Sequence, residues 1–399
     1  MPASPSTARV INDRLALGLL QREGPLTANQ LKQLTGLSRP SVADLVERLQ
    51  GSGLIAVVGE AGAQRRGPNA RLYGIVADQA HLAALDVRTE GVSVVVTDLL
   101  GAVLAEASAT IGGDTDTGPA VERAVALVER TAEEGGSGRL HTVAIGAPGL
   151  IDPTTGELRD TTALPAWHRR LAGALQDRLP ARVLVENETN LAARAEQRDG
   201  AAHDRDTFVL LWLGEGVGAA VVLDGTLRRG ASGGTGEIGF LPVPGTAVLP
   251  SATGCEGGFH SLVCAAALRE LAAEHGVAVG EHGVAVGEHG VAVGGEAADL
   301  VRHAVSTGHE AFLDAVADRV AVGAAATAAI LDPGCVVLGG EVGRAGGDVL
   351  ATRVEGRLAA MSPLRTEVRA STLGGSAVLR GALLAARDAA QDELFGPRR

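Results

Sequence analysis

The apolar positions at the start of the chain follow the 3.6-residue period of an α-helix. Leu15, Leu19 and Leu20 share one face of a helix predicted over residues 12–23. A Gly-Pro pair at 24–25 follows directly and ends this helix. The chain is therefore predicted to open with a helix that buries one face.

Two short helices are predicted next, joined by a glycine turn. Thr27, with Gln30 three residues later, forms a capping-box pattern that opens the second helix, and Gly36 ends it. Ser38 can cap the third helix, which tolerates Pro40 in its first turn. The buried stripe of the third helix is Val42, Leu45, Val46 and Leu49. Two short helices joined by such a turn are typical of a helix-turn-helix unit.

Two strands are expected after the third helix, over residues 54–58 and 71–76, with a basic tip between them. The tip carries Arg65 and Arg66, whose side chains suit DNA phosphates or a narrow minor groove. A basic hairpin next to a helix-turn-helix predicts a winged helix-turn-helix domain over residues 1–76. This domain is called the head below.

The third helix would enter the major groove of DNA by its N-terminal residues. The predicted DNA-facing residues there are Ser38, Arg39, Ser41 and Asp44. Arg39 and Ser41 suit phosphates or base edges, and Asp44 suits the N4 amino group of cytosine. The alternative is a small helical packing module that binds no DNA and faces acidic side chains to solvent.

From Leu82 onward the pattern changes from helical to strand periodicity. Strands are predicted over 82–87, 92–98, 102–107, 142–146, 183–185, 208–213, 219–223 and 336–338. Helices are predicted over 121–133 and directly after the strand at 183–185. Strands that alternate with helices indicate an α/β body.

Residues 274–294 consist of three identical copies of EHGVAVG. The seven-residue period is that of a coiled coil, but two glycines per copy and little apolar surface oppose one. His275, His282 and His289 recur once per copy and would be the donors of a metal site if the copies came together. We favour a surface loop.

The charge of the 399-residue chain is unevenly distributed. Residues 1–75 hold nine Lys or Arg and five Asp or Glu, a net charge of +4, whereas the whole chain carries −12. A basic head on an acidic body suits a DNA contact confined to one end.

Composition excludes several classes of protein. No apolar run reaches the roughly 18–20 residues of a membrane span, and residues 1–8 lack the pattern of a signal peptide. Three cysteines, Cys255, Cys264 and Cys335, do not make a disulfide framework. We expect a cytoplasmic protein with no membrane partner.

Head and body together resemble the ROK family, which contains repressors and sugar kinases, over about residues 10–390. The stretches that carry the resemblance are GPLTANQLKQLTGLSRPSVADLVERLQGSGLI, RRGPNARL, LPAW (164–167), VENETNLAARAE (185–196), LWLGEGVGAAVVLDGTLRRGASGGTGEIG (211–239) and LDPGCVVLGG (331–340). The resemblance implies an actin-like, ribonuclease-H-like α/β body of two lobes, with a ligand site between them. The first lobe would span 80–186 plus 376–395, and the second 187–375 with the repeat inserted.

The positions that matter for phosphoryl transfer depart from the kinases of the family. Glu188 stands after Asn187 where the family has its catalytic aspartate, and a displacement of about 1 Å can cost on the order of 10² in rate. The first phosphate loop, 86–90, lacks the glycine pair of the family. The second, 214–216, reads Gly-Glu-Gly instead of Gly-Thr-Gly, and its carboxylate would repel phosphate. Although Gly339-Gly340 remains, we expect no ATP cofactor and no kinase activity.

The structural zinc site of the family also looks replaced. The matching positions hold Phe240, Val248, Pro250 and Cys255. One thiolate does not make a tetrahedral site. His260 and Cys264, predicted four residues apart on one helix, are the only route to a rearranged site. We expect no bound metal.

What remains of the family's sugar site is Asn187, Glu188 and Glu237, with Pro148, Gly149 and the LPAW segment nearby. Carboxylates and an amide suit paired hydrogen bonds to vicinal hydroxyls. The alternative is that Glu188 merely caps a helix and Glu237 is inherited scaffold.

These predictions together describe a DNA-binding regulator, a repressor, that senses a sugar or sugar-like ligand. Dimers or tetramers would present paired heads to an inverted-repeat operator. Two rivals remain open: an ATP-dependent sugar kinase with a regulatory head, and a DNA-binding regulator that needs no ligand.

Overall fold

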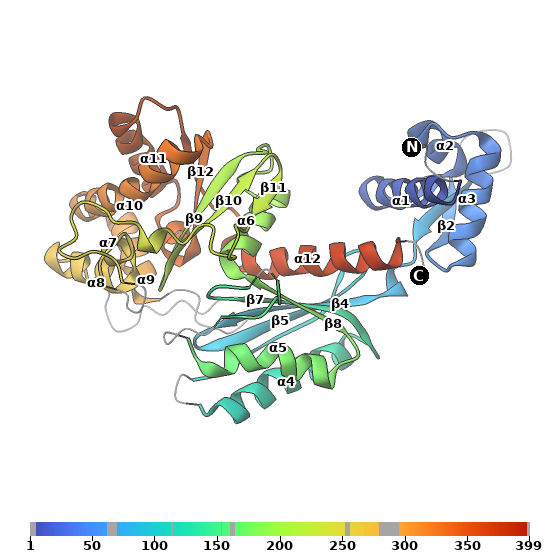
Figure 1. Cartoon of the computed structure of the whole chain (residues 1–399), viewed down its shortest axis with the longest axis horizontal. Helices are drawn as coiled ribbons and strands as arrows, with labels where there is room; N and C mark the ends of the chain where they lie inside the picture. The colour runs from blue at the N-terminus through green and yellow to red at the C-terminus, as the bar shows by residue number, and fades with distance from the viewer. Residues whose placement is uncertain are drawn as a thin grey trace.

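The structure, a computed structural model, describes residues 5–61, 70–112, 115–152, 154–159, 164–251, 256–278 and 295–396. The chain forms a head and a body of two lobes (Figure 1). Arg65 and Arg66 of the predicted wing tip, and His282 and His289 of the repeat, lie outside the described residues.

The head consists of three helices and a small antiparallel sheet of order β1-β3-β2. Its elements are α1 (Pro5–Glu23), β1 (Leu26–Thr27), α2 (Ala28–Thr35), α3 (Arg39–Gly51), β2 (Ile55–Ala61) and β3 (Ala70–Ile75). Helix α1 begins at Pro5 rather than at Asn12, and proline suits the first turn of a helix. The predicted winged helix-turn-helix is confirmed.

The predicted caps of the head are also confirmed. The Thr27 hydroxyl accepts from the Gln30 backbone N–H at 3.2 Å, and the Gln30 side chain accepts from the Thr27 N–H at 2.9 Å. Gly36 ends α2 with φ 70°, a conformation that favours glycine. The Ser38 hydroxyl accepts from the Ser41 N–H at 3.3 Å and so caps α3.

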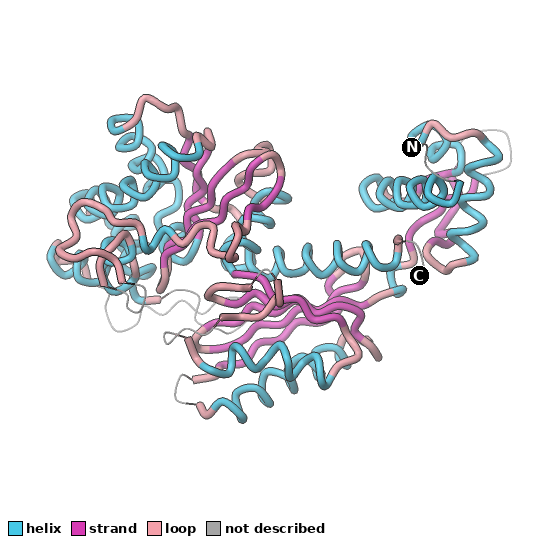
Figure 2. Tube along the Cα trace, in the orientation of Figure 1, coloured by secondary structure: helices cyan, strands magenta, loops and turns pink. Residues whose placement is uncertain are grey.

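The first lobe is built on a five-stranded sheet of order β6-β5-β4-β7-β8. Its elements are η1 (Ala77–Gln79), β4 (His81–Arg88), β5 (Gly91–Asp98), β6 (Val103–Thr110), α4 (Thr117–Glu134), β7 (Leu140–Ala147), α5 (Ala166–Arg178), β8 (Arg182–Asn187) and α12 (Ala377–Leu394). Helices α4 and α5 cover one face of the sheet and α12 covers the other (Figure 2). The β4–β5–β6 meander is antiparallel, whereas β4, β7 and β8 run parallel.

The second lobe repeats this design with a sheet of order β11-β10-β9-β12-β13. Its strands are β9 (Phe208–Leu213), β10 (Val217–Leu223), β11 (Thr226–Arg228), β12 (Cys335–Gly339) and β13 (Glu367–Ala370). Its helices are η2 (Ile238–Phe240), α7 (His260–Val263), α8 (Ala265–Glu274), α9 (Glu296–Thr307), α10 (Glu310–Leu331), α11 (Gly340–Met361) and η3 (Gly374–Ser376). The predicted two-lobed α/β body is therefore confirmed.

Helix α6 (Glu188–Asp199) packs on α12 of the first lobe and on β9 and β10 of the second. The approach of α6 to α12 is very close, because a Cβ built on Gly381 would lie 2.0 Å from the Leu191 carbonyl oxygen. This packing holds the N-terminal end of α6, with Asn187 and Glu188, where the two lobes meet.

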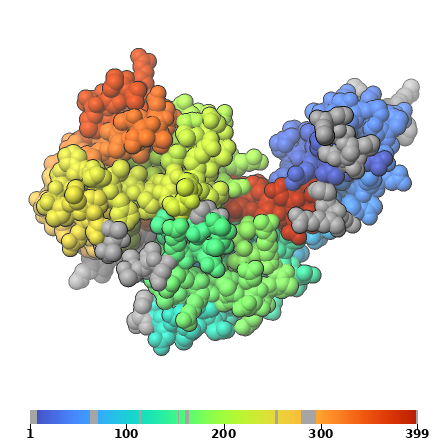
Figure 3. Space-filling model, in the orientation of Figure 1, coloured from blue at the N-terminus to red at the C-terminus, as the bar shows by residue number. Residues whose placement is uncertain are grey.

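The head packs against the C-terminal end of α12 (Figures 1 and 3). Leu17 of α1 and Leu99 and Ala390 of the body belong to one continuous cluster of buried apolar residues. An ion pair between Arg14 and Asp392, 2.5 Å long, adds a polar contact across this junction. The head is thus packed on the body as well as tethered to it.

Only the first residues of the repeat are described, at the end of α8. His275 caps this helix, and its ring centroid lies 6.2 Å from that of Phe312. Within the described segments, no helix is both long and apolar enough to cross a membrane.

Candidate DNA-binding face and interlobe site

The predicted DNA-facing residues lie together on the exposed N-terminal half of α3. Ser38, Arg39, Ser41 and Asp44 are all exposed. Ser38 is occupied by its capping role, and its hydroxyl lies 2.8 Å from that of Ser41. The side chain of Arg39 makes no hydrogen bond or ion pair with another residue in the described ranges, so its guanidinium is available to a phosphate or a base edge.

Asp44 is placed differently from the sequence-based expectation. Its carboxylate pairs with Arg48 one turn further along α3, and Arg48 also binds Asp13 of α1 at 2.6 Å. The hydrogen bonds that Arg48 donates to the Asp13 carboxylate raise the pKa of Arg48. Because Asp44 is already paired, a cytosine amino group would have to compete with Arg48 for it. Arg39 is therefore the stronger candidate for contact with DNA.

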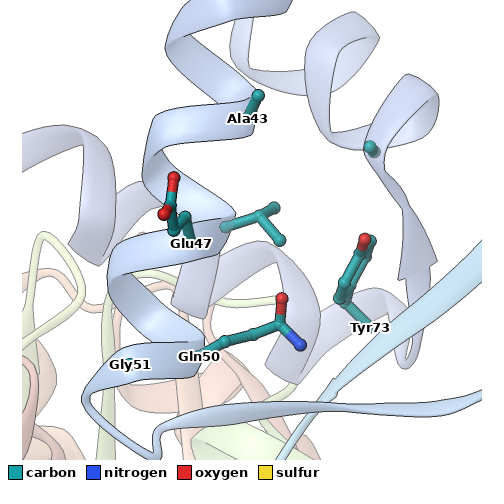
Figure 4. A pocket seen from close by; sticks show the side chains of 7 residues that line it. Ala43, Glu47, Gln50, Gly51 and Tyr73 are labelled. Atoms are coloured by element: carbon teal, nitrogen blue, oxygen red, sulfur yellow. The ribbon is translucent and has the colours of Figure 1, made fainter.

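The head also carries a hollow of about 570 Å³ beside α3 (Figure 4). Glu47 and Gln50 of α3 face it from one side and Tyr73 of β3 from the other. The Glu47 carboxylate disfavours DNA phosphates at this hollow. Sequence periodicity does not predict this hollow, because the hollow depends on the spacing between α3 and β3.

A cluster of charged residues joins the lobes at the ends of β4 and β12. Arg88 binds Asp86 through two hydrogen bonds, from Nε and Nη2, each 2.9 Å long. Its Nη1 donates to Glu341 in the first turn of α11, in the other lobe. The Arg88 guanidinium also lies 5.6 Å from the ring centroid of Trp212. We call Asp86, Arg88, Glu188 and Glu341 the interlobe cluster.

This cluster lies against the positions that match the phosphate loops. Asp86 and Arg88 come from the stretch matching the first loop. A Cβ built on Gly214, in the second, would lie 2.3 Å from a carboxylate oxygen of Glu341 and 3.3 Å from the Trp212 indole nitrogen. The carboxylate of Glu215 points to the start of α9, 2.8 Å from a Cβ built on Gly295. The chain's own side chains therefore lie on the loop glycine that would receive phosphate oxygens.

Glu188, the residue at the family's base position, belongs to this cluster. Burial, opposed by Arg88 and reinforced by Glu341 and Asp86, raises the pKa of Glu188 to about 8. Its carboxyl group is therefore protonated at neutral pH and can donate a hydrogen bond.

The alternative that Glu188 caps a helix is wrong, because Asn187 caps α6. The short Asn187 side chain accepts from the backbone N–H groups of Thr189 and Asn190, at 2.9 and 3.2 Å. Its amide nitrogen donates to the Gly149 carbonyl at 3.0 Å. Asn187 thus fixes the Pro148-Gly149 turn beside α6, and few of its hydrogen-bonding groups remain for a ligand.

Glu237 approaches the same turn from the second lobe. A Cβ built on Gly234 would lie 3.5 Å from Leu150 and 3.7 Å from Glu237. Burial raises the pKa of Glu237. A second ion pair between the lobes, from Arg229 to Glu186 at 2.5 Å, lies at the end of β8. The predicted ligand residues are thus brought to one region where the lobes meet.

The LPAW segment ends in Trp167, and the next residue, His168, was not singled out by the sequence analysis. Trp167 and His168 at the start of α5 are buried, with ring centroids 4.3 Å apart. The indole nitrogen of Trp167 has no hydrogen-bond partner among the described residues, and the His168 ring lies next to the backbone of Arg88. Burial lowers the pKa of His168 to about 4, so its ring is neutral at physiological pH.

The zinc-matching positions do not fit a zinc ion. Phe240 and Val248 are exposed and apolar, Pro250 offers no donor side chain, and Cys255 lies outside the described residues. The prediction of one helix through His260 and Cys264 is wrong. The chain leaves the helix at Cys264, where the next N–H, of Ala265, donates to the Gly214 carbonyl at 3.1 Å.

No three metal-ligating side chains come together in the part of the chain that the structure describes. The described histidines and cysteines therefore do not build a site in place of the family's zinc ligands.

Comparison with known proteins matches both parts of the chain. The ROK family model matches residues 82–389, and the MarR family model matches residues 12–67. A glucokinase of Halalkalibacterium halodurans is 28% identical over 247 residues, 60% of this chain and 74% of the relative. The xylose repressor of Bacillus subtilis is 22% identical over 248 residues, 60% of this chain and 62% of the repressor, less than two thirds of its length.

A solved structure shares the fold of the whole chain. It is that of a ROK family transcriptional regulator, a homologue of the Escherichia coli MLC protein, with a TM-score of 0.75 and 20% identity. The likeness covers 97% of this chain and 98% of that one, so it includes the head. The match to the ROK family model covers the body alone, and it spans both lobes. The chain belongs to the ROK family.

Proposed function

We propose that the chain is a DNA-binding transcriptional regulator, a repressor, whose body senses a sugar. The observation that carries the proposal is the exposed, unpaired Arg39 on a capped recognition helix, joined to a body whose phosphate positions are filled by its own side chains. The likeness to a xylose repressor and to a ROK family transcriptional regulator supports it. A regulator of this kind would act in the cytoplasm.

The interlobe cluster argues against phosphoryl transfer. ATP brings several negative charges to the two phosphate loops, and here the carboxylates of Asp86 and Glu341 already lie at those loops and share Arg88 as their ion-pair partner. Glu188, protonated at neutral pH, is a poor general base. We infer that kinase activity has been lost and that no ATP or metal cofactor is needed.

The same region remains suitable for a neutral sugar. Protonated Glu188 can donate to a hydroxyl, and Glu237 supplies a second carboxyl group from the other lobe. A sugar bound between them would favour one lobe arrangement by its differential affinity for the two states. In a homodimer, this change would alter the spacing of two heads on an inverted-repeat operator.

The test combines DNA binding with a sugar panel. The purified full chain should protect an inverted repeat in the DNA upstream of its own gene, and xylose or glucose should change its affinity for that DNA. The same preparation should transfer no phosphate from ATP to these sugars. Turnover that Glu188→Gln abolishes would establish the kinase rival. DNA binding that no sugar alters, with no calorimetric heat, would establish a ligand-independent regulator.

A further inference from the structure

A second cavity, of about 300 Å³, lies at the junction between head and body. It has walls from α1 and both wing strands on the head side, and from the β5–β6 turn, α6 and α12 on the body side. Its apolar side chains are Leu20, Val58, Ile75 and Leu100, and its cations are Arg198 and Arg387. This volume is at the lower end of the roughly 300–1,000 Å³ usual for small-molecule sites.

The apolar lining of this junction cavity is aliphatic. Leu20 and Ile75 are buried, whereas 53% of Val58 and 41% of Leu100 remain exposed. The last two lie on different units, Val58 on a wing strand and Leu100 on the first-lobe turn, and both line the same hollow. Exposed aliphatic side chains that converge in this way offer a surface to the apolar part of a ligand.

The two cations of the cavity have no ion-pair partner among the residues that the structure describes. Arg387 lies against the β5–β6 turn, 3.8 Å from a Cβ built on Gly101, and its Nε is buried without a partner among the described residues. Burial lowers its pKa. Of the nearby carboxylates, Asp388 is paired with Arg194 and Asp199 acts at longer range. Arg198 is exposed and makes no hydrogen bond or ion pair with another described residue.

We propose that this junction cavity binds a small aliphatic anion, a carboxylate or a phosphate monoester, between head and body. The anionic group would bind Arg387 and Arg198, since the buried Nε of Arg387 has no partner among the described residues and an unsatisfied buried donor is unfavourable. The aliphatic part would lie on Leu20, Val58, Ile75 and Leu100. This site is separate from the interlobe site and independent of the proposed sugar.

The position of the cavity gives the ligand a role in the head's attachment. Leu20 and Val58 belong to the head, whereas Arg198 and Arg387 belong to the body. A complete site therefore exists only when the head is docked on α12. The bound anion stabilises the docked arrangement in proportion to its affinity.

The experiment is calorimetry on the full chain in the absence of DNA and sugar. Four probes separate charge from shape: hexanoate, its neutral amide hexanamide, butyl phosphate and inorganic phosphate. At least one of hexanoate and butyl phosphate should bind saturably. If hexanoate binds, hexanamide should bind at least about tenfold more weakly than hexanoate. If only butyl phosphate binds, the anion is a phosphate monoester; if only hexanoate binds, it is a carboxylate.

Two variants locate the site. Arg387→Gln and Arg198→Gln should each weaken the binding of the active probe by at least about tenfold. Arg380→Gln is the matched control, because Arg380 lies on the same helix, bound to Ser376 and outside the cavity lining. Circular dichroism and thermal melting identify any variant that fails to fold.

Four results would overturn the proposal. One is the absence of saturable binding by both hexanoate and butyl phosphate. Another is saturable binding of hexanoate and hexanamide with equal affinity. A third is binding of inorganic phosphate as tight as that of butyl phosphate. The last is full binding in both folded Arg387→Gln and folded Arg198→Gln. Each of these can occur while the DNA and sugar binding of the proposed function remain intact.

Discussion

Arg88 and Glu341, 253 residues apart in the sequence, form an ion pair that joins the two lobes of the body. The same guanidinium binds Asp86 and faces the ring of Trp212. One cation thus holds carboxylates from both lobes at the place where the kinases of the family would bind phosphate. In this chain, an ion pair between protein side chains joins the lobes there.

Arg88→Gln should destabilise the body. It leaves Asp86 and Glu341 close together without their cation, and breaking such a partly buried pair costs about 3 kcal/mol. The thermal midpoint of the body should fall by several degrees. Arg88→Lys keeps the charge but not the paired geometry, so its thermal midpoint should lie between those of wild type and Arg88→Gln. An unchanged midpoint for Arg88→Gln would show that the ion pair contributes little.

The stability of the folded chain should depend on pH through Glu188. The pKa of this residue is about 8 in the folded chain, well above its ordinary value. Glu188 therefore contributes to the free energy of unfolding in full below the pKa of the unfolded chain, and this contribution is lost as pH rises towards 8. The slope is at most about 1.4 kcal/mol per pH unit. Between pH 6.5 and 8, where His168 is neutral, wild type should lose stability relative to Glu188→Gln. Parallel curves for the two proteins would contradict the raised pKa.

Ser38→Ala should lower the stability of the head by about 1 kcal/mol, because the first turn of α3 loses its side-chain cap. Ser38→Gly should cost only a few tenths of a kcal/mol. Hydrogen exchange of the α3 amide groups measures this effect without DNA. A larger loss in Ser38→Gly than in Ser38→Ala would refute the capping role.

Arg39→Ala should weaken operator binding without changing the stability of the head, since its side chain has no partner in the described part of the chain. If Arg39 contacts a base edge, the loss is about 1–3 kcal/mol at that base pair. If Arg39 contacts a phosphate, the loss of binding affinity is the same for all DNA sequences. Arg170→Ala, an exposed change on α5 far along the chain, is the control. Equal affinities of Arg39→Ala and Arg170→Ala for the operator would exclude Arg39 from the DNA interface.

Much of the head and body could be predicted because the signals are local. A cap needs only Thr27 and Gln30, or Ser38 and Ser41, and these lie within one helical turn of each other. The strands of both sheets likewise follow from short apolar runs between turns. Pairing the strands into two lobes, however, required the family resemblance, since periodicity alone does not specify strand order.

The parts that were not predicted depend on contacts between distant segments. Arg88 gives no local sign that it pairs with Glu341, and Asp44 is paired by a residue that is itself fixed by Asp13 of another helix. The break at Cys264 follows from the hydrogen bond between Ala265 and Gly214, fifty residues earlier. The sequence does offer two signals for the interlobe cluster: Arg88 in the first phosphate loop, and Glu341 directly after Gly340.

The most direct test of the account is the salt dependence of DNA binding, measured by fluorescence anisotropy with the DNA upstream of the gene. Arg39, Arg65 and Arg66 on each of two heads would make six phosphate contacts. The affinity should then fall by on the order of 10³ between about 50 and 200 mM salt. Loss of Arg39 should reduce the slope by about one per contact removed. Absence of binding at low salt, or an affinity that salt does not change, would contradict the account.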